Sequence, residues 1–172
     1  ILVCWEEPRT EDEGKRDWVK AAVAKTWETK SALKFKEWSA CEAQTKGIRI
    51  KVEDTGPHVK SLGKYLDGWP GGMVLNFTFG QWGESCQDTL EQCIKSIAVH
   101  EFGHAVGFSH EQNRLDTPAE CMESKDEFPG DAPDMTPWDP ESVMNYCNSK
   151  YNNDGQLSTL DVQAVQKIYG VP

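Results

Sequence analysis

The sequence of 172 residues contains no apolar run near the roughly 20 residues that a helix needs to span a bilayer. Positive charge is also scarce: 18 Lys and Arg residues stand against 28 Asp and Glu residues, for a formal net charge of −10. This deficit argues against nucleic acid and against anionic membrane surfaces as partners. The sequence also lacks internal repeats, low-complexity tracts and linkers, so its length predicts one domain, 1–172.

The six cysteines are scattered and form no C-x-x-C pair. Their even number, beside a separate histidine segment that could serve a metal, predicts three disulfides and a secreted protein. The alternative is a set of six reduced thiols in the cytosol. The sequence leaves the pairing open, but closeness favours Cys86–Cys93, with Cys4–Cys41 and Cys121–Cys147 as the further pairs. The triplet NFT at 76–78 is a glycosylation sequon, whose use is also open.

Histidine is scarce as well, yet three of the four histidines lie in the one stretch HEFGHAVGFSH. On a helix, His100 and His104 lie one turn apart on the same face, so their rings can converge on one point, with Glu101 close to it. His110 can reach that point only if the chain turns back, and Gly107 permits the turn because glycine adopts positive φ angles. Three imidazoles and one open position predict a catalytic zinc site.

Three segments have the apolar spacing or the capping residues of helices. They are 16–30, capped by Asp17; the helix of His100 and His104, opened by a capping box of Asp88 and Glu91; and 157–170, opened by Ser158 and Asp161 and ended by Gly170.

Alternating apolar residues predict strands at 33–38, 48–53 and 73–80. Residues 56–72 are rich in glycine and are expected to form a loop. The segment 116–142 contains five prolines, nine acidic residues and one lysine, which is typical of an irregular loop. A sheet-bearing first part, followed by a helix with metal ligands and an irregular second part, predicts an α+β fold.

HEFGHAVGFSH together with SVMNY (142–146) resembles the metzincin clan of zinc endopeptidases, in which H-E-x-x-H-x-x-G-x-x-H is followed by a methionine-containing turn. Met144 stands at the turn position. The chain is most similar to the astacin family, because Glu111 follows the third histidine and Tyr146 follows the methionine by two residues. The C-terminal helix also has matrixin-like features.

The metzincin resemblance implies a fold of two subdomains with the active-site cleft between them. The first, approximately 1–107, would contain a twisted mixed sheet and two helices. The second, approximately 108–172, would be irregular and end in a helix. The resemblance also implies that residues 73–79 form a sheet edge that pairs with extended substrate.

The residues and the resemblance together indicate a secreted zinc metalloendopeptidase acting on protein or peptide substrates. His100, His104 and His110 would bind one zinc ion, and Glu101 would act as general base toward the zinc-bound water. By resemblance, Met144 forms an apolar floor under the histidines. Tyr146 would bind zinc in the free enzyme and then donate a hydrogen bond to the oxyanion.

Further expectations concern the partners. By resemblance, Glu111 would contact the N-terminus freed by propeptide removal, so a propeptide or a protein inhibitor is a candidate partner. The acidic segment 116–142 is expected to line the cleft and to favour basic or neutral substrate side chains. Calcium is unknown, because the oxygen-rich NNDG (152–155) lacks EF-hand spacing.

The alternative function is a catalytically inactive zinc-containing binding module on the same scaffold. Such proteins usually lose the glutamate or a histidine of the motif. This chain retains Glu101 and all three histidines, which favours the enzyme.

Overall fold

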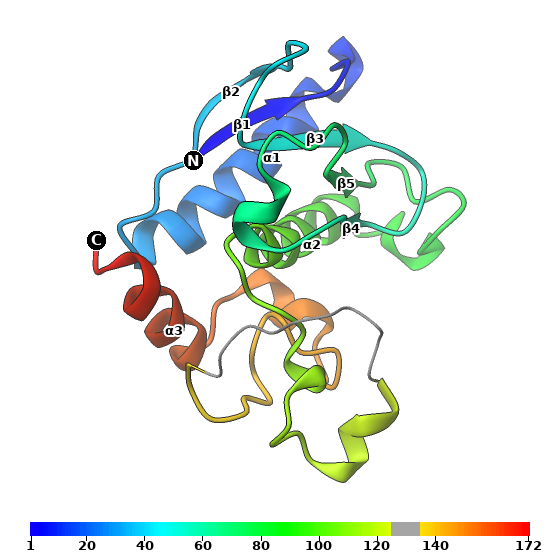
Figure 1. Ribbon diagram of the computed structural model, residues 1–172. Coiled ribbons are helices and arrows are strands. Elements are labelled where there is room, and N and C mark those ends of the chain that lie inside the picture. The colour runs from blue at the N-terminus through cyan, green and yellow to red at the C-terminus, as the bar shows by residue number, and fades with distance from the viewer. Residues whose placement is uncertain (125–134) are drawn as a thin grey trace.

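A computed structural model describes residues 1–124 and 135–172 of the chain (Figure 1). Five strands form a mixed sheet in the order β2-β1-β3-β5-β4, in which β4 runs antiparallel to β5 and the other neighbours run parallel. The strands are β1 (Leu2–Trp5), β2 (Lys36–Ala40), β3 (Ile48–Val52), β4 (His58–Val59) and β5 (Met73–Leu75). The predicted mixed sheet is confirmed.

The sheet edge next to β5 is β4, so the prediction that residues 73–79 form the substrate-pairing edge is wrong. β5 lies between β3 and β4, and its residues Met73 and Val74 pair with Val59 and His58. The sequence does not reveal this edge strand, because two residues within a glycine-rich segment are too few to show an alternating pattern.

β5 is shorter than the predicted strand at 73–80, because the side chain of Asn76 ends it. The Asn76 carboxamide oxygen accepts hydrogen bonds from the backbone N–H groups of Thr78 (2.9 Å) and Phe79 (2.8 Å). Such a side chain replaces the sheet hydrogen bonds with a local turn. Phe79 consequently adopts a φ of +53° while its ring stays buried.

β2 begins three residues later than the predicted strand at 33–38. The backbone N–H of Phe35 donates to the Glu28 carboxylate (2.6 Å). The ring of Phe35 packs edge-on against Phe102 at a centroid distance of 5.0 Å. The residues before β2 therefore bind the preceding helical turn and pack against the core, and strand pairing begins only after them.

In the described parts of the chain, three α-helices accompany the sheet, namely α1 (Glu13–Val23), α2 (Leu90–Ala105) and α3 (Thr159–Tyr169). A π-helical turn, Ala24–Glu28, continues α1. The predicted capping box of α3 is confirmed, because the Ser158 hydroxyl accepts from the Asp161 N–H and the Ser158 N–H donates to the Asp161 carboxylate. Gly170 ends α3 with a φ of +87°.

Two other capping predictions are wrong. Asp17 lies inside α1, because the helix already begins directly after a short 3-10 turn. The capping box of Asp88 and Glu91 is not formed, since Thr89 occupies the N-cap position of α2 without a side-chain bond. Glu91 instead forms an ion pair with Lys95 one turn further along the helix.

The core lies between the sheet and the helices α1 and α2, which run together along one side of the sheet in Figure 1. Trp27 is fully buried and connects three parts of the fold. Its indole N–H donates to the carbonyl of Val99 in α2 (2.9 Å), and its ring stacks on Phe108 with centroids 5.7 Å apart. The segment that follows α2 is thus packed against the same tryptophan as α2 itself.

The three expected disulfides are confirmed, and all six cysteines take part in them. One bond ties β1 to the segment after β2, and another lies at the entry to α2. The third joins the 3-10 turn Ala119–Ser124 to the segment that follows Tyr146. The pairs are Cys4–Cys41, Cys86–Cys93 and Cys121–Cys147. Within residues 1–124 and 135–172, no helix is long and apolar enough to cross a membrane.

Asn76 is unsuited to glycosylation, because it is only 1% exposed and its amide nitrogen donates to Asp54 and to the carbonyl of Thr55, both at 3.0 Å. We expect Asn76→Ala to lower the free energy of unfolding by about 1–3 kcal/mol, since several buried groups lose their partner. Urea denaturation measures the change. Gln81→Ala, at an exposed position, should stay within about 0.5 kcal/mol, and an equal loss in both variants would contradict the role of Asn76.

Candidate metal centre

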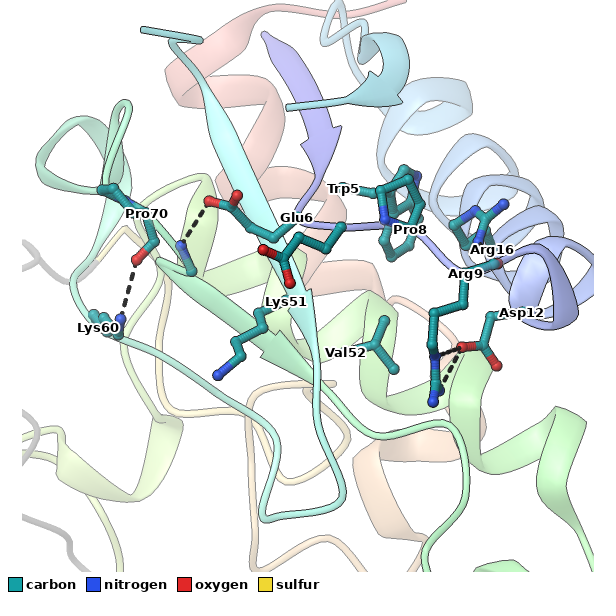
Figure 2. A pocket seen from close by; sticks show the side chains of 12 residues that line it. Trp5, Glu6, Pro8, Arg9, Asp12, Arg16, Lys51, Val52, Lys60 and Pro70 are labelled. Atoms are coloured by element: carbon teal, nitrogen blue, oxygen red, sulfur yellow. Dashed lines mark hydrogen bonds and ion pairs between the residues drawn. The ribbon is translucent and has the colours of Figure 1, made fainter. Parts of the chain in front are cut away.

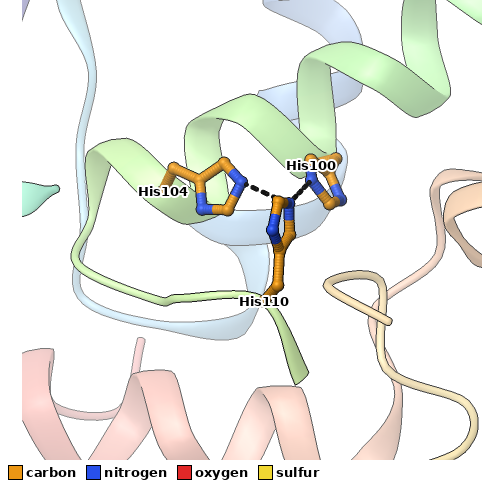
Figure 3. A group of neighbouring side chains, drawn as sticks. All are labelled: His100, His104 and His110. Carbon is orange, nitrogen blue, oxygen red and sulfur yellow. Dashed lines mark hydrogen bonds between the residues drawn. The ribbon is translucent and has the colours of Figure 1, made fainter. Parts of the chain in front are cut away.

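The three histidines converge on one point, as the motif predicts. His100 and His104 lie in α2, which ends at Ala105. Gly107 follows with a φ of +103°, and the chain turns back to bring in His110. The Nε2 atom of His110 lies 3.1 Å from Nε2 of His100 and 3.0 Å from Nε2 of His104 (Figure 3). All three side chains are buried.

Backbone carbonyls fix the orientation of two of these rings. Nδ1 of His100 donates to the carbonyl of Val143 (2.8 Å), and Nδ1 of His104 donates to the carbonyl of Phe108 (2.7 Å). Because a carbonyl can only accept, both Nδ1 atoms carry the proton, and both Nε2 atoms present a lone pair to the shared point. Unprotonated nitrogens aimed at one point fit a cation such as zinc.

Among the described residues, no second group of three or more His, Cys, Asp or Glu side chains converges in this way. Residues 152–154 of the NNDG segment form a left-handed turn, with φ angles of +47°, +47° and +52°. That segment supplies no such cluster, so calcium binding stays open.

The methionine turn packs directly under α2. Met144 is 2% exposed, and a Cβ atom at Gly103 would overlap its sulfur atom. The backbone N–H of Glu111 donates to the carbonyl of Met144 (3.0 Å), which ties the turn to the segment after His110. Met144 therefore lies against the helix that carries His100 and His104. Its carbonyl is hydrogen-bonded to the residue that follows His110.

A buried carboxylate holds this turn in place. Asp161 accepts hydrogen bonds from the Ser142 hydroxyl (2.7 Å) and from the backbone N–H groups of Val143 and Ser158 (both 2.9 Å). Burial raises the pKa of Asp161, while these donors oppose the shift. The capping box that opens α3 thus also anchors the turn, a role that its sequence pattern does not reveal.

Tyr146 lies against the histidine cluster. Its ring is nearly parallel to that of His100 (11°) at a centroid distance of 5.3 Å, and its centroid lies 4.4 Å from that of His110. The side chain is 46% exposed. The structure therefore brings the predicted tyrosine to the histidine cluster.

Glu101 is buried beside the histidines, with 4% exposure. Burial raises its pKa to about 8, because desolvation disfavours the charged carboxylate. Burial also raises the pKa of Tyr151, and the negative charge of Glu101 raises it further. Tyr151 thus belongs to the surroundings of Glu101, although no motif in the sequence identifies it.

The predicted contact between Glu111 and the N-terminus is not formed in this structure. The Glu111 carboxylate accepts from the N–H of Asp139 (2.8 Å) and pairs with Arg114 (3.4 Å). The ammonium group of Ile1 donates to the carbonyl of Lys34 (2.8 Å), because β1 holds this end of the chain between β2 and β3. Burial raises the pKa of Glu111 to about 7, and the positive charge of Arg114 opposes the shift.

The acidic segment 116–142 is described only in part, since residues 125–134 lie outside the described residues. Asp116 forms a bidentate ion pair with Arg114, with both contacts at 2.8 Å. The Asp139 carboxylate accepts a hydrogen bond from the Ser158 hydroxyl (2.5 Å). These two carboxylates make internal contacts. That the segment lines the cleft stays a prediction.

A separate groove of about 550 Å³ lies where β1 ends, between the start of α1 and the Pro70–Gly71 turn (Figure 2). Its charges largely neutralise one another. The Arg9 guanidinium bonds the Asp12 carboxylate at 2.6 and 2.9 Å, and Lys60 donates to the carbonyl of Pro70 (3.1 Å). This groove includes none of the three histidines.

Comparisons with known proteins agree with the geometry of the histidine site. Residues 80–122, about a quarter of the chain, match the model of the astacin peptidase family. A structure of myroilysin is 19% identical, with a TM-score of 0.65, over 100% of this chain and 94% of that chain. High choriolytic enzyme 1, a hatching enzyme zinc-protease from Oryzias latipes (medaka fish), is 19% identical, with a TM-score of 0.60, over 100% and 90%. No curated protein sequence matches the chain.

The predicted resemblance to the astacin family is therefore confirmed over the histidine motif by the family match, and the fold along the whole chain is similar to those of myroilysin and the hatching enzyme. The matrixin-like features of the C-terminal helix stay a prediction.

Gly103→Ala tests the packing of the methionine turn. Alanine is the better helix former, but its methyl group would meet Met144 and lie 3.2 Å from Trp27 Cζ2. We expect the free energy of unfolding to fall by about 1–3 kcal/mol, measured by chemical denaturation. Gly14→Ala in α1 is the matched control, because nothing lies within 4 Å of the added Cβ. A Gly103→Ala variant as stable as the Gly14→Ala variant would contradict this packing.

Proposed function

We propose that this astacin-like chain is a secreted zinc metalloendopeptidase that hydrolyses peptide bonds in protein substrates. The observation that carries the proposal is the convergence of three buried histidine Nε2 atoms on one point, with Glu101 buried on the helix that holds two of them. Bound zinc would supply a Lewis acid that polarises the peptide carbonyl and makes water more acidic. The three disulfides support an oxidising, extracellular location.

The protein side chains divide the remaining work. His100, His104 and His110 would hold the metal, with the first two oriented by backbone carbonyls. Glu101 would take a proton from the attacking water and deliver it to the departing amine. The burial of Glu101 on the helix of His100 and His104 supports this role.

Tyr146 would donate a hydrogen bond to the oxygen of the peptide carbonyl as negative charge develops on it. The position of its ring beside His100 and His110 supports this role. The half-exposed ring can approach a substrate lying over the histidines.

An extended substrate would pair with β4. This strand is the terminal strand of the described sheet on the β5 side, so its outer main-chain groups face away from β5. The segment after β4 brings Gly63 close to Gly107, in the bend between the second and third histidines. A peptide added along β4 would gain main-chain hydrogen bonds, and side-chain pockets would set the sequence preference.

We expect Glu101→Gln to retain one zinc ion per chain and to lose almost all hydrolysis, because the base is removed and the metal ligands stay. Metal analysis and cleavage of a quenched-fluorescence peptide measure the two quantities. The control is Glu91→Gln, an exposed change on the same helix. A fully active Glu101→Gln variant would exclude Glu101 as the base. Wild-type protein that binds zinc and cleaves no denatured protein would favour the inactive binding module.

Tyr146→Phe should lower kcat with little change in KM and with normal zinc content, because the hydrogen bond forms mainly in the transition state. The loss of one such donor costs about 10²–10³-fold in other hydrolases, and the effect here should lie at or below that range. Steady-state kinetics measure it, with Tyr65→Phe as the control at a side chain that is 71% exposed. An unchanged turnover rate would remove Tyr146 from the mechanism.

A further inference from the structure

Gln112 contacts Tyr146 from a fully buried position. It lies in the 3-10 turn Glu111–Asn113, directly after His110, and is 0% exposed. Its carboxamide oxygen accepts a hydrogen bond from the backbone N–H of Tyr146 (3.1 Å). Since an N–H can only donate, this bond fixes which end of the amide faces the tyrosine.

The other end of the Gln112 amide has no such partner. Its nitrogen is buried and makes no hydrogen bond within the described parts of the chain. A buried donor without an acceptor lowers stability relative to an apolar side chain of the same size. Packing alone would therefore favour methionine or leucine here, and the contribution specific to glutamine is the acceptor that it offers to Tyr146.

This acceptor belongs to a pair of connections between the third histidine and the methionine turn. The backbone N–H of Glu111 donates to the carbonyl of Met144 (3.0 Å), and the next residue, Gln112, receives the N–H of Tyr146. Two consecutive residues after His110 thus bind two alternate residues of the turn. The second connection holds the backbone of Tyr146 at a set position relative to His110.

The backbone position of Tyr146 determines where its ring lies over the histidines. The ring lies over His100 and His110, while 46% of the side chain is exposed. A shift of the Tyr146 backbone would move the ring and its hydroxyl with it. A change of about 1 Å in the position of a group that contacts the transition state can cost up to about a hundredfold in rate.

We propose that Gln112 is a positioning residue that sets the reach of the Tyr146 hydroxyl toward the substrate by holding the Tyr146 backbone N–H. This inference rests on the proposed function, because it assigns no chemistry to Gln112 itself. Its effect should therefore be seen in kcat rather than in KM, and only while the hydroxyl of Tyr146 is present.

A double-mutant cycle tests the proposal on the full chain loaded with zinc. Gln112→Met removes the amide acceptor at nearly constant volume, and it is measured alone and combined with Tyr146→Phe. We expect Gln112→Met to lower kcat about tenfold or more with zinc content retained. In the Tyr146→Phe background the same change should lower kcat by less than about twofold, because the hydroxyl that it positions is already absent.

Gln166→Met is the matched control. Gln166 lies near the C-terminal end of α3, and its side-chain amide donates to the carbonyl of Lys30. The Gln166→Met change should leave kcat unchanged. If Gln112→Met does not fold, Gln112→Asn enters the same cycle, because it keeps the amide and withdraws its oxygen from the Tyr146 N–H.

The proposal would be overturned if Gln112→Met lowered kcat equally with and without the Tyr146→Phe change. It would also be overturned if Gln112→Met alone left kcat unchanged. A Tyr146→Phe variant with unchanged kcat would instead overturn the mechanism assigned to Tyr146. Zinc-loaded wild-type protein without peptidase activity would overturn the proposed function as a whole. The failures are therefore distinguishable.

Discussion

Met144 packs against α2 at Gly103, where a side chain larger than hydrogen would overlap its sulfur atom. This close approach brings the carbonyl of Val143 to His100 and the carbonyl of Met144 to the N–H of Glu111. The same turn carries Tyr146 to the histidines. The orientation of the first histidine, the return path of the third and the place of the tyrosine thus all depend on one contact between an irregular segment and a helix.

Burial raises the pKa of three carboxyl groups in this part of the fold, those of Glu101, Glu111 and Asp161. They differ in their partners. Asp161 receives three hydrogen bonds, and Glu111 has a backbone donor together with the guanidinium of Arg114. One oxygen of Glu101 has no hydrogen bond from the described residues. Hydrogen-bond donors fix the carboxylates of Asp161 and Glu111 in place. Glu101 instead has an oxygen that is available for a proton.

The sequence predicted the metal centre more closely than the sheet, for a physical reason. His100, His104 and Gly107 lie within one helix and its end, where local geometry determines what converges. β4 and the turn at Asn76 depend instead on long-range pairing and on one side chain that takes the backbone bonds of its neighbours. Periodicity cannot show a strand of two residues or a strand that ends within an alternating run.

The same limit applies to residues that support the centre. Gln112, Asp161 and Tyr151 are ordinary polar residues in the sequence, and only the folded chain brings them to the turn or to Glu101. The contact of Glu111 was expected by resemblance, and it failed because the sheet holds Ile1 elsewhere. Local patterns therefore identified the groups suited to chemistry, and tertiary packing determined which groups hold them in place.

The shortness of β4 has a consequence for the behaviour of the protein in solution. A terminal strand that can accept a peptide can equally accept the sheet of another molecule, which is a common route to aggregation. β4 consists of only His58 and Val59. Two residues give a second copy of the chain too few main-chain hydrogen bonds for lasting association. A flexible peptide that also contacted the histidine centre would have further points of attachment, so under the proposed function the short edge would discriminate between a substrate and a copy of the protein itself.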